Sequence, residues 1–544
     1  MSDVPPFETH VVDNQPPDFT PRDLWGDDVA LREALMANGA QDFAGHVAAY
    51  GRLAGDTLMV LASDVHRDRP RLRSHDRFGR RIDRVEFHPG YHALLEAAIG
   101  HGMTGLSWTD GRSGAHVARA ALSYLHSQAE PGTSCPLTMT HAAVPVLRRE
   151  PMLREWADKA ASTRYDAREV PIGEKAGITL GMGMTEKQGG SDVRANTTVA
   201  TPLAGDAGYA LVGHKWFFSA PMSDGFLVLA QAPGGLSCFL VPRRLPDAEK
   251  NAFRLVRLKD KLGDWSNASS EVEFTGACAH RVGEEGNGIQ TILEMVMLTR
   301  LDCMLGSAAL MRMALAQGIH HCRHRRAFGK ALVDQPLMRN VLADLAIESE
   351  AALALSMRVA RAVDLAPGDP REAAHARIAT AIGKYWICRR TPAFVNEAQE
   401  SLGGNGYVEE SILPRLYRQA PLNSIWEGSG NIQCLDVLRA LAREPETGAA
   451  LRADLQDVDG ADDAFFAAVE PLQPALEGHV AIEPGNARRF VEQLALVLQA
   501  SVLLRTRSPI AEAFCRSRLH EPHRLAFGTL APGIDTQSVL GRAL

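Results

Sequence analysis

The hydrophobic residues of this chain repeat with two different periods, and the change of period divides the sequence into blocks. Up to about residue 180, and again over 286–443, apolar residues recur three or four positions apart, which is the spacing of one buried face of an α-helix. Examples are Ala30, Leu31, Ala34 and Leu35 before the change, and Ile289, Ile292, Leu293 and Val296 after it. Both blocks are therefore predicted to be helical.

The block between them has the pattern of short β-strands. Runs rich in β-branched and aromatic residues alternate with Gly, Pro and Asp turns, as strands and their connections do. The predicted strands cover 195–201, 209–218, 225–232, 236–241, 253–258 and 271–275. The predicted fold class is therefore mainly α with an inserted β-domain.

These patterns predict five segments along the chain. They are an extended N-terminal arm (1–28), an N-terminal helical domain (29–180), a β-domain (181–284), a helical bundle domain (285–443) and a C-terminal helical domain (444–544). The prolines of the arm exclude a helix there. We expect the arm either to be disordered or to pack on another subunit. Glu444–Gly448 is predicted to be a linker.

Composition restricts the class of protein. The 544 residues are 45% hydrophobic and 23% charged, and their mean hydropathy is -0.13, as in an ordinary globular protein. No apolar run approaches the ~20 residues that span a bilayer, and no signal-peptide pattern is present, so we expect a cytoplasmic protein without a membrane partner. The eight cysteines are scattered, which predicts reduced thiols and no metal site.

The stretch 421–432 carries the strongest candidate chemistry. Glu427 lies between Trp426 and a Gly-Ser-Gly run, immediately before an apolar helical pattern. Glycines allow the backbone to approach a ligand closely, and a buried glutamate with a raised pKa can act as a general base. The alternative interpretation is that Glu427 is an acid favoured by the helix dipole. The residues of this stretch alone leave both open.

Four short motifs occur together in one order. They are G-M-T-E-K-Q-G-G-S-D (183–192), R-R-A-F-G-K (325–330), L-G-G-N-G-Y (402–407) and W-E-G-S-G-N-I (426–432). In this order they resemble the boxes of the acyl-CoA dehydrogenase family. With H-K-W-F-F-S (214–219), their spelling is most similar to the AidB branch, the bacterial alkylation-response flavoproteins. The resemblance covers essentially the whole chain, although 444–544 matches only that branch.

The resemblance implies a fold, a cofactor and a set of site residues. It implies a helical domain, a β-barrel or sandwich domain and a four-helix bundle, with an extra C-terminal helical domain. It also implies FAD as cofactor, an acyl-CoA thioester as substrate, and Glu427 as the base that removes the substrate's α-proton. The cofactor-binding residues that it implies are Met182, Met184, Thr185, Gln188, Gly190, Ser191, Trp216, Phe217, Phe218, Ser219, Arg325, Phe328, Gly403, Gly404, Asn423, Trp426, Ser429 and Asn431.

Some details of this implied site depart from the family pattern. Phe217 stands where the family usually has Trp, and Ser219 where it has Thr. The three aromatics of 216–218 can also fill a β-domain core, so we expect Phe217 and Ser219 near the flavin and one neighbour in the core. Some branches of the family place the base one residue before an arginine, which corresponds to Arg300 in this chain. Here that position is Thr299, which leaves Glu427 as the candidate base.

The family pattern also predicts assembly. Arg325 and the Gly403-Gly404 turn belong to boxes that contact the FAD of a neighbouring subunit in the family. The resemblance therefore implies a homo-oligomer, expected to be a tetramer of two dimers. An arginine fork suits a pyrophosphate because it donates to two oxygens in one plane.

The last segment contains a candidate DNA-binding surface. The chain's net charge of -7 argues against binding nucleic acid through overall charge, but a local basic patch stays open. Arginines cluster near the C-terminus, and together with two on the preceding helix they form the predicted DNA-binding set: Arg439, Arg443, Arg505, Arg507, Arg516, Arg518 and Arg524. Such a set can neutralise phosphates without reading bases. The alternative is that these arginines pair with acids of their own domain. A second basic stretch, Arg67–Arg84, is predicted to be a solvated loop.

Three functions remain open at this point. The first is a flavoprotein of the DNA alkylation damage response, with weak or vestigial acyl-CoA dehydrogenation and sequence-independent binding to double-stranded DNA. The second is a metabolic acyl-CoA dehydrogenase of the isovaleryl-CoA type. The third is an acyl-CoA oxidase, which shares the architecture and produces peroxide. The motif spelling and the extra domain favour the first.

Overall fold

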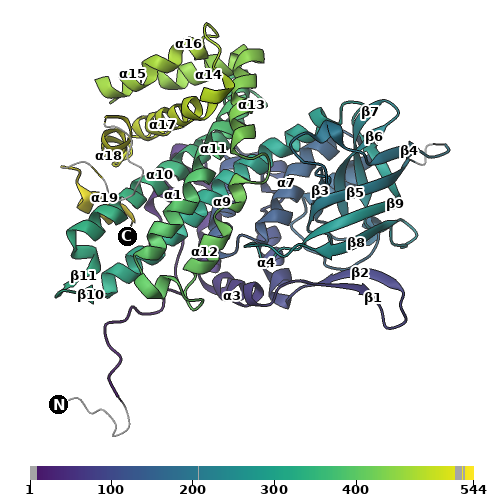
Figure 1. The fold of residues 1–544 in the computed structure, drawn as a ribbon, viewed down its shortest axis with the longest axis horizontal. Helices are drawn as coiled ribbons and strands as arrows, with labels where there is room; N and C mark the ends of the chain where they lie inside the picture. Colours follow the sequence, from purple (N-terminus) through teal and green to yellow (C-terminus); the bar gives the residue numbers. More distant parts are fainter. Residues whose placement is uncertain (1–8, 206–207, 457, 521–529, 531–532, 544) are drawn as a thin grey trace.

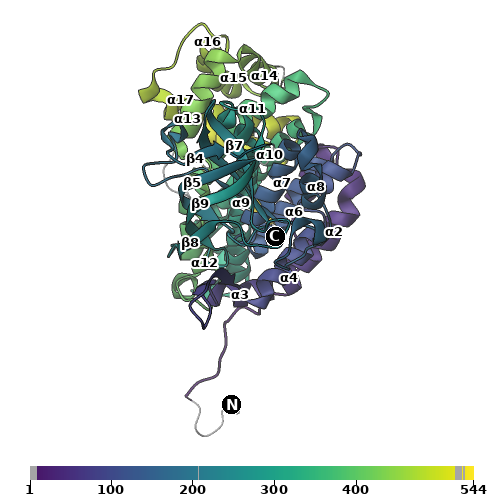
Figure 2. The ribbon, with the colours of Figure 1, turned by 90° about the vertical axis from the view of Figure 1, so that its right-hand side faces the viewer.

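The computed structural model describes residues 9–205, 208–456, 458–520, 530 and 533–543. Its elements follow the predicted order of a helical block, a β-domain and further helices (Figure 1). The N-terminal block contains α1 (Val29–Ala37), α2 (Ala44–Leu53), α3 (Met59–Arg67), α4 (Pro89–Gly100), α5 (Leu106–Thr109), α6 (Ala115–Ala129), α7 (Ser134–Arg148) and α8 (Arg154–Ala160). In Figure 2 these helices lie beside the β-strands, and the helices of residues 445–505 lie at the top.

The β-domain is a barrel with two additional strands. Its strands are β3 (Leu180–Gly183), β4 (Val199–Pro202), β5 (Tyr209–Ser219), β6 (Gly225–Ala232), β7 (Gly235–Pro242), β8 (Phe253–Leu258) and β9 (Ser269–Val282). The pairings β6–β4–β5–β9–β7 close on themselves through β6–β7, and β3 and β8 pair at the outside with β6 and β9. Closure removes the open edges of five strands. The barrel has its own core, which includes Phe218, Phe226, Phe253 and Phe274.

The bundle consists of three long helices and shorter ones. They are α9 (Gly288–His324), α10 (Pro336–Leu365), α11 (Pro370–Glu400), α12 (Leu413–Gln419) and α13 (Gly430–Arg443). A small hairpin, β10 (Arg326–Ala327) and β11 (Lys330–Ala331), joins α9 to α10. The bundle shares one continuous hydrophobic core with the N-terminal helices and with the C-terminal segment. The fold class predicted from the sequence is therefore confirmed.

The C-terminal segment is helical, as predicted, but the predicted linker before it is wrong. It contains α14 (Pro445–Leu455), α15 (Asp463–Val469), α16 (Gln473–Leu476), α17 (Ala487–Arg505), α18 (Ala511–Cys515) and α19 (Thr536–Ala543). Only Glu444 separates α13 from α14, because Pro445 occupies the first turn of α14, where its missing N–H costs no hydrogen bond. A proline at a helix start was mistaken for a loop signal.

The predicted basic loop also differs in the structure. Residues of this stretch form an antiparallel hairpin, β1 (Arg71–His75) and β2 (Arg81–Glu86), with Leu72 paired to Val85. Both of these apolar side chains pack against the barrel core. The sequence pattern was missed because arginines occupy most of the outward positions and mask the alternation.

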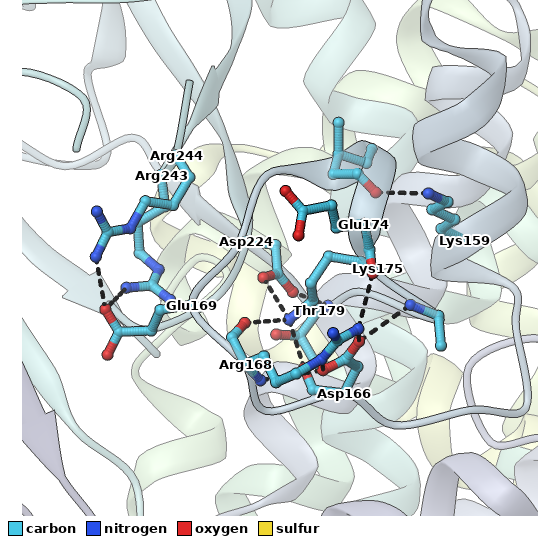
Figure 3. Close-up of polar contacts among 12 residues, drawn as sticks. Lys159, Asp166, Arg168, Glu169, Glu174, Lys175, Thr179, Asp224, Arg243 and Arg244 are labelled. Carbon is cyan, nitrogen blue, oxygen red and sulfur yellow. Dashed lines mark hydrogen bonds and ion pairs between the residues drawn. The ribbon is translucent and has the colours of Figure 1, made fainter. Parts of the chain in front are cut away.

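A connecting segment fixes the β-domain to the N-terminal helices (Figure 3). The buried ammonium of Lys175 donates to the carbonyl of Arg168 (2.8 Å) and pairs with the carboxylate of Asp224 (2.9 Å). Asp224 also accepts the backbone N–H of Thr179 (3.0 Å), immediately before β3. These contacts position the first glycine-rich box, residues 183–192, because β3 leads directly into it. Within the described ranges, no helix has the length and apolar character required to cross a membrane.

Candidate functional site

The backbone of the Glu427 loop has an unusual conformation. Glu427 has φ of +58°, which is rare for a residue with a Cβ atom, and Gly428 follows with φ of +91°. A Cβ atom on Gly428 would lie 2.7 Å from the side-chain nitrogen of Gln433, and its positive φ is strained for residues with a Cβ atom, so this position favours glycine. Two successive left-handed residues turn the chain sharply before α13. In this turn the Glu427 side chain is half-buried.

Three side chains from the bundle hold this strained turn. The buried ammonium of Lys384, on α11, donates to the carbonyl of Trp426 (2.6 Å) and to that of Gly428. Arg300, on α9, donates through Nε to the Glu427 carbonyl (3.0 Å). Gln433 donates to the carbonyls of Glu427 (3.0 Å) and Gly428 (2.9 Å). The charge-assisted hydrogen bonds from Lys384 and Arg300 are strong enough to stabilise an unfavourable backbone conformation.

The Glu427 carboxylate points to α9. The Thr299 hydroxyl donates a hydrogen bond to Glu427 Oε2 (2.9 Å). Burial raises the pKa of Glu427 above its ordinary value, and the Thr299 hydroxyl, Lys384 and Arg300 act in the opposite direction. The position where other branches of the resembled family carry the base is therefore next to Glu427 in space. Among the described residues, no acceptor engages the Glu427 backbone N–H, so it is available to a ligand.

The first glycine-rich box is held by a buried ion pair. Glu186 and Lys215 are both fully buried and lie 2.7 Å apart. The Glu186 carboxylate also accepts the backbone N–H groups of Thr197 (2.7 Å) and Thr198 (3.2 Å), and these contacts lower its pKa to about 2. Burial lowers the pKa of Lys215 to about 8. Together they fix the turn that carries Thr185, Gly190 and Ser191.

The predicted flavin residues of this box lie in β3 or in the segment that follows it. Thr185 is partly exposed, and its carbonyl accepts the backbone N–H of Trp216 (2.8 Å), which joins the box to β5. A Cβ atom on Gly190 would lie 2.4 Å from the Thr185 hydroxyl. Gln188 is exposed, and its side-chain nitrogen donates to Glu186 (2.7 Å). Met182 is buried in β3, and Met184 packs against the large core.

The aromatic residues of β5 face opposite sides of the strand, because successive side chains of a strand alternate in direction. Phe217 is 54% exposed, whereas Phe218 is fully buried, with its ring 4.4 Å from that of Phe226. The prediction that the Phe218 side chain binds the cofactor is therefore corrected: it fills the barrel core. Trp216 faces the Lys259 ammonium, 3.4 Å from its ring centre. The Ser219 hydroxyl is partly buried, 3.3 Å from that of Ser269.

The remaining predicted residues around Glu427 have mixed environments. Asn423 is buried: its amide nitrogen donates to Ser307 (3.1 Å), and its oxygen accepts the indole N–H of Trp426 (3.0 Å). Ser429 is exposed at the start of α13 and makes no capping hydrogen bond with its side chain. Asn431 accepts from Arg488 of the C-terminal segment (2.8 Å).

The other two boxes meet at one end of the bundle. Cys322, three residues before Arg325, lies with its sulfur 3.8 Å from the carbonyl of Ser401, two residues before Gly403. Phe328 is 98% exposed, and Gly403 and Gly404 are exposed.

The N-terminal arm reaches this end of the bundle. Arg325 donates to the carbonyl of Asn14 (2.8 Å), and the Asn14 side chain accepts the Arg326 backbone N–H (2.8 Å). His320 of α9 also contacts the carbonyl of Pro17 (2.8 Å). The described part of the arm thus packs on its own chain, which differs from the expected disorder, whereas packing on another subunit stays a prediction.

The predicted DNA-binding arginines do not form one face. Arg518 is buried and pairs with Asp344 (2.6 Å) and Glu348 (3.2 Å) of α10, so its assignment to a DNA surface is corrected. Arg505 donates to carbonyls at the end of α14, including that of Gln456 (2.7 Å). Arg443 precedes the start of α14, and a helix of 11 residues is about 16 Å long, so these two arginines are far apart.

The other members of the set are more accessible. Arg507 is exposed beside Asp459 (3.1 Å), and Arg439 and Arg443 are exposed on α13. Arg516 contacts the carbonyl of Gly533 (3.3 Å). Arg524 lies outside the described residues.

Two parts of the site were not predicted. They are the contacts of Lys384 with the Glu427 loop and the buried pair of Glu186 and Lys215. Both depend on tertiary burial, which no local sequence pattern shows, because the partner that a buried ammonium requires can lie far away along the chain. Within the described ranges, no three His, Cys, Asp or Glu side chains converge as metal ligands would.

The residues present fit a flavin. The half-exposed ring of Phe217 lies on the strand next to the Ser219 hydroxyl, and the Thr185 box is joined to the same strand. A planar, partly apolar ring with carbonyl and nitrogen acceptors suits one exposed aromatic and two hydroxyl donors.

Three family models match the chain in order. Residues 14–167 match "Adaptive response protein AidB N-terminal domain", residues 181–277 match "Acyl-CoA dehydrogenase, middle domain" and residues 286–442 match "Acyl-CoA dehydrogenase, C-terminal domain". The chain is 48% identical over 518 residues to "Putative acyl-CoA dehydrogenase AidB" of Escherichia coli (strain K12), with 94% of this chain and 95% of the other covered.

Two solved structures resemble the whole fold. The complex of Caenorhabditis elegans ACDH-11 with C11-CoA superposes with a TM-score of 0.85 at 25% identity, covering 95% of both chains. The apo form of Bd2924 superposes with a TM-score of 0.84 at 27% identity, covering 92% of this chain and 100% of the other.

The contact between Thr299 and Glu427 makes a prediction about proton affinity. Thr299→Val removes a hydroxyl that favours the ionised carboxylate, so the pKa of Glu427 should rise further. Infrared difference spectroscopy of the protonated carboxyl band, referenced to Glu427→Gln, measures the midpoint. The midpoint should move to higher pH in Thr299→Val, while Thr299→Ser, which keeps the hydroxyl, should match wild type. Equal midpoints in all three proteins would contradict this role of Thr299.

Proposed function

The chain belongs to the acyl-CoA dehydrogenase family of FAD-dependent oxidoreductases, and we propose that Glu427 is the base with which it removes the α-proton of an acyl-CoA thioester. The observation that carries this proposal is the held carboxylate: Glu427 is half-buried, its pKa is raised, and its loop is fixed by Lys384, Arg300 and Gln433. FAD supplies the acceptor for the β-hydride when it is bound.

The protein groups around the carboxylate have separate tasks. The raised pKa of Glu427 makes its carboxylate a better proton acceptor than an exposed glutamate. The free backbone N–H of Glu427 binds the thioester carbonyl, where negative charge develops as the proton leaves. The Thr299 hydroxyl orients the carboxylate through Oε2. The reaction requires the ionised carboxylate, so its rate falls as pH decreases through the raised pKa.

Glu427→Gln tests this function. The substitution keeps the shape of the side chain but removes the proton acceptor, so anaerobic reduction of the flavin by a panel of acyl-CoAs should slow roughly 100-fold or more. Glu294→Gln is a matched control, because Glu294 is another partly buried glutamate with a raised pKa, on the same helix as Thr299. Unchanged reduction in Glu427→Gln would mean that the base lies elsewhere. Rapid peroxide formation when oxygen is admitted would favour the acyl-CoA oxidase alternative, and prompt reduction by isovaleryl-CoA would favour the metabolic one.

The complete cofactor site is proposed to require a homo-oligomer, a tetramer of two dimers. The support is the end of the bundle where Arg325 and Gly403 lie, which exposes large apolar side chains: Phe328 is 98%, Tyr407 84% and Leu337 83% exposed. Surfaces of this kind usually bind another protein surface.

Light scattering and FAD retention test the assembly together. Arg325→Ala should weaken FAD retention by about 1.5–3 kcal/mol, since a buried pyrophosphate would lose a charged donor. Arg326→Ala, which removes a neighbouring exposed arginine, serves as control. A wild-type monomer that holds FAD tightly would contradict the shared site.

A second proposed function is sequence-independent binding to double-stranded DNA in the bacterial response to DNA alkylation and its repair, with weak acyl-CoA dehydrogenation. The support is the match of 14–167 to the adaptive-response domain and the similarity to AidB. We propose a cytoplasmic location for this function. The cysteines agree with it, because all of those among the described residues are unpaired. Among the described residues of the predicted set, Arg439, Arg443, Arg505 and Arg507 are exposed, and of these Arg505 donates to carbonyl groups near the end of α14.

The salt dependence of DNA affinity tests this second function. Wild-type log K should fall linearly with log salt, because bound phosphates release counterions. Arg439→Ala/Arg443→Ala removes two charges one turn apart on α13, and if they contact phosphate it should flatten the slope by roughly one to two units. If wild type shows no measurable affinity at low salt, the second function is wrong. An unchanged slope in the variant would exclude α13 as the contact.

A further inference from the structure

The β1–β2 hairpin is a basic part of the described surface that lies outside the C-terminal segment. Between residues 67 and 86 there are eight arginines and four carboxylates, in a chain whose net charge is -7. Figure 1 shows the hairpin along the lower edge of the β-domain, with its turn projecting beyond the barrel, far from α14–α17. The sign of this local charge is opposite to that of the whole protein, so it attracts a different class of partner.

The turn of the hairpin holds an aromatic ring in solvent. The Asp76 carboxylate accepts the backbone N–H groups of Phe78 (2.8 Å) and Arg80 (3.0 Å), and Gly79 takes the left-handed conformation that the turn requires, with φ of +80°. Phe78 is 66% exposed. The guanidinium carbons of Arg77 and Arg80 lie 4.5 and 5.1 Å from its ring centre. The ring is therefore presented outward between two cations by a fixed turn.

The strands of the hairpin have one buried and one basic face. Leu72 and Val85 form a cross-strand pair that packs on the barrel core. On the outer face, Arg73 lies directly opposite Arg84, an arrangement of like charges that is unfavourable without an anion between them. The Arg73 side chain is 56% exposed, and its only ion pair among the described residues is an exposed one with Glu86, at 3.3 Å. Exposed pairs of this kind are weak and exchange readily for another anion.

The base of the hairpin also has an excess of cations. A single carboxylate, Glu169, is shared by Arg84 (2.9 Å), Arg243 (3.1 Å) and Arg244 (3.0 Å). Figure 3 shows Glu169 with Arg243 and Arg244. The Nε atoms of both of these arginines are buried without a hydrogen-bond partner among the described residues. The positive charge of the outer face thus continues into the body of the protein.

We infer that the β1–β2 hairpin is a nucleic-acid contact of this protein, with arginines on the phosphates and Phe78 against the bases of double-stranded DNA. A two-stranded ribbon is narrow enough to enter a DNA groove, and apolar side chains can insert between base steps. The outer arginines supply the sequence-independent attraction. The inference rests on the proposed DNA binding and assigns it to a different surface from the C-terminal arginines.

The two parts of the contact have different experimental signatures. Arg73→Ala/Arg77→Ala should flatten the dependence of log K on log salt by roughly one to two units, because each lost phosphate contact removes released counterions. Phe78→Ala should lower affinity roughly tenfold at every salt concentration and leave the slope unchanged, because ring contacts release no counterions. Fluorescence anisotropy of a labelled duplex on the FAD-loaded full chain measures both quantities.

Matched controls separate the hairpin from general effects. Arg149→Ala/Arg154→Ala removes the same charge from exposed positions of the N-terminal helices, and Phe466→Ala removes an exposed ring from the C-terminal segment; both should behave as wild type. The hairpin variants should keep the FAD content and melting temperature of wild type, because the changed side chains are exposed.

Each outcome has a distinct meaning. Wild-type DNA affinity with no change in the hairpin variants would overturn this inference and leave the proposed DNA binding intact. A wild-type protein without DNA affinity would overturn both. If wild type binds vesicles containing anionic lipid but not DNA, and the hairpin variants lose this vesicle binding, the hairpin contacts a membrane surface and the inference is overturned.

Discussion

The geometry of the Glu427 loop depends on one buried ammonium group. Lys384 donates to the carbonyls on both sides of Glu427, those of Trp426 and Gly428. A lysine at this depth is costly unless its charge is solvated by the protein, and two carbonyl oxygens supply that solvation. The same two hydrogen bonds hold Glu427 in a left-handed backbone conformation, which is unfavourable for a residue with a Cβ atom. The carboxylate therefore points at α9 because a cation on α11 holds the backbone around it.

The same use of buried charge recurs at the other structural joints. Glu186 and Lys215 fix the glycine-rich box on the barrel, and Lys175 with Asp224 fixes the segment that leads into it. Arg518 joins the C-terminal segment to Asp344 of α10. Pairs of this kind contribute little net stability, but the loss of one partner leaves an uncompensated charge, so they define where segments lie. An arginine with this role cannot also serve a DNA phosphate.

The sequence predicted the fold class, the strands of the barrel and the order of the helices, because hydrophobic period and turn residues are local signals. It missed the β1–β2 hairpin, where arginines hide the alternation, and it read Pro445 as a linker when that residue begins α14. The position of Glu427 followed from a motif, whereas its partners Thr299 and Lys384 lie 128 and 43 residues away and only tertiary packing brings them together. Phe217 and Phe218 differ only in the side of β5 that each faces, and the strand register decides which ring is buried.

The central claim is that Glu427 is the base, and proton exchange tests it most directly. An acyl-CoA analogue with sulfur in place of the β-carbon cannot transfer a hydride, but its α-proton remains acidic. Incubated with the FAD-loaded protein in D₂O, it should take up deuterium at the α-carbon with wild type and should take up none above the rate in buffer with Glu427→Gln, as mass spectrometry would record. Equal uptake with the two proteins would contradict the account.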